Sequence, residues 1–300
     1  MKFKASTLVG IIIGLAAIFG AFLWEGGTID TLFMLPPMII VIVGTLAAGA
    51  AGSSFEMMAK LPKLFYITIS SKDYDFNRII EQIVDYAQKA RKEGILALEN
   101  KLDRLDHPYL RKLFQICIDG ADPDTLEQIV ETEMYHITER HHKNRNLFTK
   151  MGGYSPTMGI IGTVMGLISV LASAGENPNV LIHHIAMAFI ATMWGILLAN
   201  LVWLPISDKL KVLHDEEMQL YKLMLDGVKA VQLGEVPSVI RAKLLTALPM
   251  DEQEKISKYK MVSFYSQSGE NRTTSQGKDS SSSSEEKEPQ NVNINLNRGE

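Results

Sequence analysis

The chain has 300 residues and a formal net charge of −4 at pH 7, which excludes a general nucleic-acid binder, since such a protein normally carries a basic face. Hydrophobic residues make up 46% of it, but they are unevenly spread, with long stretches that carry no formal charge. The mean hydropathy of only +0.05 means that a substantial polar part must fold in water beside any membrane segments.

Two apolar segments near the N-terminus are each about long enough to cross the hydrocarbon core of a bilayer. They are Leu8–Leu23 and Met34–Ala51, and neither contains a charged residue. Lys2 and Lys4 precede the first segment, as in a signal peptide, but no small-residue cleavage signature follows it. We therefore expect two membrane-spanning helices.

The polar region that follows has the pattern of short helices joined by turns. Apolar residues at helical spacing run from a candidate N-cap at Asp75 to a stop at Gly94. Two further helical stretches pass through Leu98–His107 and Leu110–Gly120. This region is expected to fold in water.

A long helix is predicted to begin at Asp122 and Pro123 and to continue without a breaker into the membrane. The apolar segments Thr157–Ala174 and Ile185–Ile206 predict two further spans, the second with an interfacial boundary at Trp203. Four spans are therefore expected.

The C-terminal part begins with one more predicted helix, which leaves the membrane after the last span and ends at Gly234. From about Met261 to Glu300 the chain is dominated by Ser, Asn, Glu, Gln and Lys, with too few apolar residues to bury. We expect this tail to be disordered.

Basic residues give the expected orientation of the spans. No Lys or Arg occurs between Lys4 and Lys60, or between Lys150 and Lys209, so the two short connections between spans should face away from the cytoplasm. The sequence thus predicts an all-α integral membrane protein with four transmembrane helices, a helical cytoplasmic domain between spans two and three, a C-terminal cytoplasmic helix and both termini inside. The predicted division is 1–58 for spans one and two, 59–150 for the cytoplasmic domain, 151–206 for spans three and four, 207–260 for the C-terminal helical segment and 261–300 for the tail.

Residues that suggest metal binding or catalysis do not complete a site. The pairs His141-His142 and His183-His184 point about 100° apart on a helix, and no Cys or carboxylate pattern joins them. The only cysteine, Cys117, lies in an apolar run and is expected to be a buried thiol. No phosphate loop, serine elbow or metalloprotease helix occurs. We expect no enzyme activity, no bound metal and no cofactor.

Small residues gather on one face of each of the last two predicted spans. Close packing of the two spans is the simplest explanation for the glycines, whereas a threonine hydroxyl can also contact water, a carboxylate or a dehydrated cation. The two faces comprise Gly159, Gly162, Thr163, Gly166 and Ser173, and Ala188, Ala191, Thr192, Gly195 and Ala199.

Charged residues are missing from all four predicted spans. Cation movement through lipid usually needs an ionisable or carbonyl group at depth. If the protein conducts cations, the carboxylate is therefore expected to come from a partner.

Several segments resemble the flagellar stator A subunits of the MotA/PomA type, within the MotA/TolQ/ExbB superfamily. Ala87–Glu99 is similar to the cytoplasmic signature of that family, with a basic pair, a glycine and a terminal glutamate. Tyr154–Leu167 resembles its third span, 191–205 its fourth, and Asp226–Pro249 its C-terminal segment. The resemblance covers most of residues 1 to 250.

The resemblance implies a stator subunit of the bacterial flagellar motor in the inner membrane. Such a protein forms a homo-oligomer, a pentamer around a dimer of a B subunit of the MotB/PomB type, which brings the ion-binding aspartate. Passage of H⁺ or Na⁺ turns the ring, and a charged surface acts on the rotor protein FliG. Arg91 and Glu99 occupy the rotor-interaction positions, although by themselves they would be an ordinary solvated helix face.

The resemblance also assigns roles within spans three and four. Pro156 and Pro205 match coupling prolines, where a missing backbone donor permits a bend, and a plain helix boundary is the alternative. Thr192 matches a threonine shared by proton-driven and sodium-driven members, whereas Thr163 falls where sodium-driven members carry threonine. The implied ion pathway through Thr163 and Thr192 leans toward Na⁺.

Three other functions are considered. An energiser of outer-membrane transport of the ExbB/TolQ type uses a similar motor, but it has three spans. A non-conducting membrane scaffold would tolerate a bulky apolar residue at Thr192, which an ion pathway would not. An intramembrane enzyme is disfavoured because the spans hold no acid or His.

Overall fold

The computed structural model describes residues 6–70, 74–173, 175, 177–248, 250 and 253 of the chain. Helices occupy most of these residues, and no strand occurs among them, which confirms the predicted all-α fold. The chain divides into two compact units, Met1–Leu244 and Leu245–Glu300. The tail predicted to be disordered, 261–300, lies outside the described residues.

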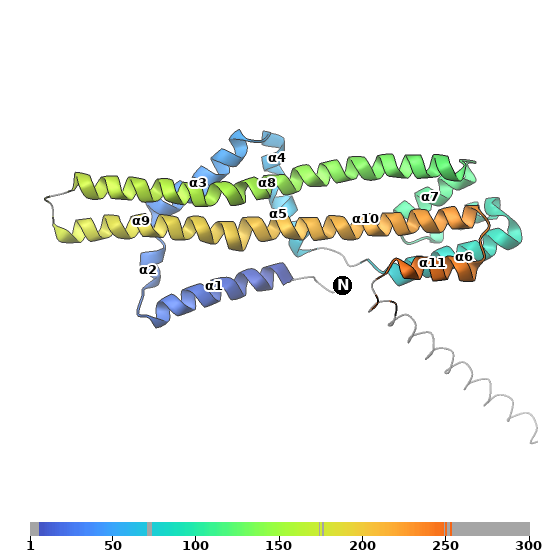
Figure 1. Cartoon of the computed structure of the whole chain (residues 1–300), viewed down its shortest axis with the longest axis horizontal. Helices are drawn as coiled ribbons and strands as arrows, with labels where there is room; N and C mark the ends of the chain where they lie inside the picture. Colours follow the sequence, from blue (N-terminus) through green and yellow to red (C-terminus); the bar gives the residue numbers. More distant parts are fainter. Residues whose placement is uncertain are drawn as a thin grey trace, which may run out of the picture. The chain divides into compact units, whose positions relative to one another are not determined.

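The helices of the chain are labelled in Figure 1. η1 is a 3₁₀-helix and η2 is a π-helix. In chain order the elements are α1 (Ser6–Trp24), α2 (Ile29–Leu32), α3 (Leu35–Ala51), α4 (Phe55–Ala59), α5 (Leu61–Ile69), α6 (Phe76–Glu93), η1 (Ile95–Arg104), α7 (Pro108–Ile118), α8 (Pro123–Ala172), α9 (Pro178–Leu198), η2 (Ala199–Trp203), α10 (Leu204–Gln232) and α11 (Pro237–Thr246).

Apolar helices occur where the sequence predicts spans. Two continuous helical runs, Pro123–Ala172 and Pro178–Gln232, contain stretches long and apolar enough to cross a membrane by length and composition. Leu8–Trp24 and Leu35–Ala51 are shorter apolar helices. The described residues therefore fit a membrane protein, with α8 and α9 as its longest apolar hairpin.

The helix α8 joins the polar region to the third predicted span without interruption, as the sequence predicts. The Asp122 carboxylate accepts hydrogen bonds from the backbone N–H groups of Asp124 and Thr125, which caps the first turn. From this cap the helix runs for 50 residues. It packs first along α10 and then along α9, which lie beside it in Figure 1.

The chain stays helical through the interfacial boundary that the sequence predicts at Trp203, so a plain helix boundary does not explain Pro205. α9, η2 and α10 follow one another without a break, and Pro205 is the second residue of α10. A π turn shifts each hydrogen-bond partner by one residue, and such a local adjustment lets a helix continue past a proline that lacks an N–H. The fourth predicted span and the helix that follows it therefore form one continuous rod.

The polar lobe is formed by α6, η1 and α7 packed against the far part of α10. α6 has the bounds that the sequence predicts: the Asp75 carboxylate accepts from the N–H of Arg78, and Gly94 ends the helix with a φ of 85°. The core of the lobe is fully buried and apolar, with 0% exposure at Ile80, Ile83, Leu98, Leu110, Leu113, Phe114 and Val228. The lobe is therefore a folded helical domain.

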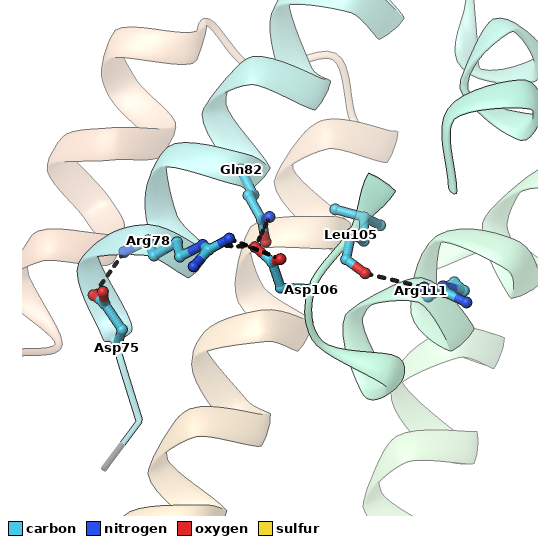
Figure 2. Close-up of polar contacts among 6 residues, drawn as sticks. All are labelled: Asp75, Arg78, Gln82, Leu105, Asp106 and Arg111. Atoms are coloured by element: carbon cyan, nitrogen blue, oxygen red, sulfur yellow. Dashed lines mark hydrogen bonds and ion pairs between the residues drawn. The ribbon is translucent and has the colours of Figure 1, made fainter. Parts of the chain in front are cut away.

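A polar network fastens the end of η1 to α6, as Figure 2 shows. The Asp106 carboxylate accepts from the Arg78 guanidinium at 2.8 Å and from the Gln82 amide. On the other side, Arg111 Nη2 donates to the Leu105 carbonyl at 3.1 Å. These contacts position η1, which carries Glu99, against the helix that carries Arg91.

Cys117 is buried, as predicted, with 4% of its surface exposed. Its Sγ lies 3.7 Å from Gln232 Oε1. Burial raises the pKa of the Cys117 thiol to about 11, because an apolar surrounding disfavours the thiolate. The thiol is therefore a packing group.

Candidate functional site

The contact between α8 and α9 is so close that larger side chains do not fit. A Cβ atom built on Gly159 would lie 2.9 Å from the carbonyl oxygen of Ala191, and one on Gly195 would lie 2.8 Å from the carbonyl oxygen of Ser155. Gly162 faces the Ala191 methyl in the same way. The glycines thus pack the two helices together, which confirms the simplest explanation of these small faces.

Thr163 and Thr192 meet within this contact. Their hydroxyl oxygens are within hydrogen-bond distance of each other, and both residues are half-buried. Thr163 Oγ1 also lies 3.1 Å from the Gly159 carbonyl and 3.0 Å from the Ala188 carbonyl. The Thr163 hydroxyl has one proton, so it donates to one of these acceptors at a time. Lone pairs on the two threonine oxygens therefore remain free to accept.

Pro156 lies inside α8, and the helix continues through it. Next to it, the fully buried Ser155 donates its hydroxyl to the Gly195 carbonyl of α9 at 3.0 Å. This bond joins the two helices at the point where α8 lacks a backbone donor. Like Pro205, Pro156 is therefore within a continuous helix.

Arg91 and Glu99 lie on the surface of the polar lobe. Arg91 is in the last turn of α6, Glu99 is in η1, and both are exposed. Among the described residues, neither side chain makes a hydrogen bond or an ion pair. Both charges are therefore available to a partner.

Metal-binding geometry is not found in the part of the chain that the structure describes. No group of three or more His, Cys, Asp or Glu side chains there is arranged to hold a metal ion. His183 and His184 of α9 contact each other only by their ring edges, with centroids 6.2 Å apart.

Known proteins share most of the length of this chain. Motility protein A of Bacillus subtilis (strain 168) is 32% identical over 253 residues, which are 84% of this chain and 93% of that protein. The chain belongs to the MotA/TolQ/ExbB proton channel family. The sequence model of this family matches residues 101–223, and the model of the motility protein A N-terminal region matches residues 8–94. Chemotaxis protein PomA of Vibrio alginolyticus is 32% identical over 247 residues, 80% of this chain and 93% of PomA.

Solved structures of the MotA/TolQ/ExbB family have the same fold. The flagellar MotAB stator complex from Bacillus subtilis has a chain that is 32% identical, with a TM-score of 0.78 over 83% of this chain and 97% of that chain. The C. jejuni MotAB structure, 24% identical and with the same TM-score, has the same fold. Within the family this chain is a stator subunit of the flagellar motor, a component of an ion channel.

Two residues that position the spans of this family member escape the sequence analysis. Ser155 bonds across to α9, and the Trp194 indole N–H donates to the Leu32 carbonyl at 2.7 Å, between α9 and the end of α2. A serine before a proline and a tryptophan in an apolar segment carry no sign of their distant partners. The structure alone reveals both bonds.

Proposed function

We propose that copies of this chain form a pentamer around a dimer of a B subunit of the MotB/PomB type, whose aspartate binds the transported cation. The absence of charge from the apolar segments supports this, because a cation at depth needs an anionic or carbonyl ligand. The related Bacillus subtilis structure is a complex of MotA with MotB. The chain is a motor component and not a catalyst of covalent change.

The observation that carries the proposed ion pathway is the pair of hydroxyls at Thr163 and Thr192, which lie within the close contact between α8 and α9. Each oxygen keeps a lone pair that can replace one water of a dehydrated cation, while its methyl group keeps the surface apolar. The pathway takes H⁺ or Na⁺, with Na⁺ favoured because of Thr163. The transported ion is the substrate, and no cofactor is involved.

The proposed topology is a four-pass protein of the bacterial inner membrane with both termini in the cytoplasm. The lack of Lys and Arg across 5–59 and 151–208 supports this orientation. The predicted segments 59–150 and 207–260 then lie together on the cytoplasmic side, in keeping with the hydrogen bond between Thr149 Oγ1 and Ser207 Oγ at 2.8 Å. The predicted segments 1–58 and 151–206 hold the spans.

The rotor-facing surface is proposed to include Arg91 and Glu99, acting on FliG. Support comes from their exposure on the polar lobe and from the lack of partners for either charge among the described residues. Pro156 and Pro205 are proposed to couple the spans to this lobe. Each removes one backbone hydrogen bond from a helix that joins the membrane to the lobe.

The deciding experiment measures the swimming speed of a flagellated strain that lacks its own stators and expresses this chain with its B subunit. Sodium is replaced by potassium at constant ionic strength and pH. Restored swimming that stops without sodium supports the stator and the sodium pathway together. Restored swimming that is indifferent to sodium keeps the stator and excludes the sodium preference. No swimming despite membrane assembly favours an ExbB/TolQ-type energiser or a scaffold.

Matched variants test the two threonines. Thr163→Ala should raise the sodium concentration needed for half-maximal speed, whereas Thr157→Ala on the same helix should not, because the exposed Thr157 hydroxyl bonds only to the Tyr154 carbonyl of its own helix. Thr192→Leu should abolish swimming while leaving assembly intact. Normal swimming of T192L would favour the scaffold.

A further inference from the structure

A cluster of ionisable side chains lies between α8 and α10, away from the proposed ion pathway and the rotor-facing surface. His141 Nδ1 of α8 lies 3.1 Å from His214 Nδ1 of α10 and 3.6 Å from Glu217 Oε2. His214 is only 8% exposed, and the three residues line one side of a cavity of about 380 Å³. Half of the other lining residues are aliphatic: Leu64, Ile67, Leu210 and Leu213.

The geometry of the two imidazoles limits how many protons they hold. When both rings are neutral, one Nδ1–H donates to the lone pair of the other Nδ1. A first added proton goes to Nε2 of the donor ring, which keeps this hydrogen bond and places a positive charge beside Glu217. A second proton would set two N–H groups and two like charges against each other at 3.1 Å. The pair therefore takes up one proton.

The charged groups around the pair act in both directions. Burial is the main cause that lowers the pKa of His141 and of His214, and Glu217 opposes it. Arg140 lowers the pKa of His141, and Asp215 raises that of His214.

Further groups complete the surroundings of the cluster. His142 of α8 has its ring 5.9 Å from that of His214 and lowers the pKa of both members of the pair. Tyr66 of α5 and Tyr74 beyond it line the cavity with phenol groups. Tyr221 donates its hydroxyl to Glu217 Oε1 at 3.0 Å, which holds this carboxylate in place from the same helix.

We propose that His141, His214 and Glu217 form a one-proton switch that loosens the contact between α8 and α10 when the cytoplasm acidifies. The neutral pair stabilises the contact above the ordinary histidine pKa of 6.5, and this contribution is lost as the pH falls below it, because the folded protein takes up the proton less readily than the unfolded chain. α8 itself carries Thr163, and α10 continues the helix that carries Thr192. The switch therefore acts on the two helices that hold the proposed ion pathway.

The test is the thermal unfolding of the purified complex of this chain with its B subunit, between about pH 7.5 and pH 5.5. His214→Asn keeps a hydrogen-bonding side chain that cannot take up a proton. We expect the loss of Tm on acidification to be smaller by about 2 to 4 °C in H214N than in the wild type. His136→Asn is the matched control, because His136 is an exposed residue of α8 whose ring contacts Tyr135.

A second variant separates proton binding from simple packing. Glu217→Gln removes a carboxylate that, with Asp215, favours the charged pair, so the loss of Tm should still begin near pH 6.5 but become larger, with its midpoint at lower pH. If H214N does not assemble, His141→Asn replaces it with the same expectation. An unchanged pH profile in H214N or H141N, or an unchanged midpoint in E217Q, would overturn the switch. The cytoplasmic location rests on the proposed topology, but the unfolding measurement does not, so the two can fail separately.

Discussion

At the scale of single residues, the closeness of α8 and α9 makes a testable demand on Gly195. A methyl group there would press on the backbone oxygen of Ser155, which cannot swing aside, so Gly195→Ala should destabilise the protein by about 1 to 3 kcal/mol. Gly153→Ala is the matched control: nothing lies within 4 Å of its Cβ position, and alanine favours the helix. Thermal unfolding of the purified complex should show a lower Tm for G195A and an unchanged or higher one for G153A.

Cys117 allows a prediction about reactivity. A pKa raised from the ordinary 9.0 to about 11 lowers the thiolate fraction about a hundredfold near pH 8, and burial restricts access further. Iodoacetamide should therefore label native Cys117 at least about a hundredfold more slowly than a cysteine at the exposed position Gln128 in a Cys117→Ala background. Mass spectrometry over time measures both rates, and equal rates would contradict the burial of the thiol.

At the scale of elements, the network at the end of η1 joins this helix, which carries Glu99, to α6, which carries Arg91. Asp106→Ala removes the acceptor shared by Arg78 and Gln82, so η1 should loosen while the apolar helices stay intact. We expect slower swimming at unchanged membrane assembly and ion flow. Asp103→Ala is the control, because this carboxylate is 99% exposed and its ion pair with Arg111 is long, at 3.6 Å. Equal speeds of D106A and D103A would show that the network does not position the surface.

Sequence patterns predict local structure in this protein well, because their causes are local. The Asp75 cap, the Gly94 stop and the start of α8 follow from a few neighbouring residues. The short helices α2 and α4 and the π-helix η2 were missed, since helices this brief depend on packing around them. A plain helix boundary at Pro205 is excluded, because α9, η2 and α10 are continuous through it, whereas the interfacial position of Trp203 stays a prediction.

The candidate site was predicted only in part. Helical periodicity places Thr163 and Thr192 on facing small surfaces, and the structure brings their hydroxyls together. The His141 and His214 contact joins residues 73 positions apart, so no spacing rule can detect it. The exposed pair Arg91 and Glu99 has no distinguishing physical feature, and only the family resemblance selects it.

At the scale of the whole molecule, the proposed function requires that one chain alone does not complete an ion site, because its apolar helices lack charge. The chain expressed without a B subunit should give no sodium uptake above background into membrane vesicles, and coexpression with the B subunit should restore it. The B subunit with its proposed ion-binding aspartate changed to asparagine is the control. Uptake by the A subunit alone would mean that backbone carbonyls suffice.

The unbroken helix α8 has a mechanical consequence. Its 50 residues, at about 1.5 Å of rise each, make a rod of roughly 75 Å that begins in the polar lobe and ends in the apolar hairpin. Such a rod acts as a lever. A tilt of about 5° at the apolar end displaces the other end by roughly 6 Å, which is about the rise of one helical turn. On the proposed function, small movements around a passing ion would thereby be enlarged into a stroke at the surface of the lobe.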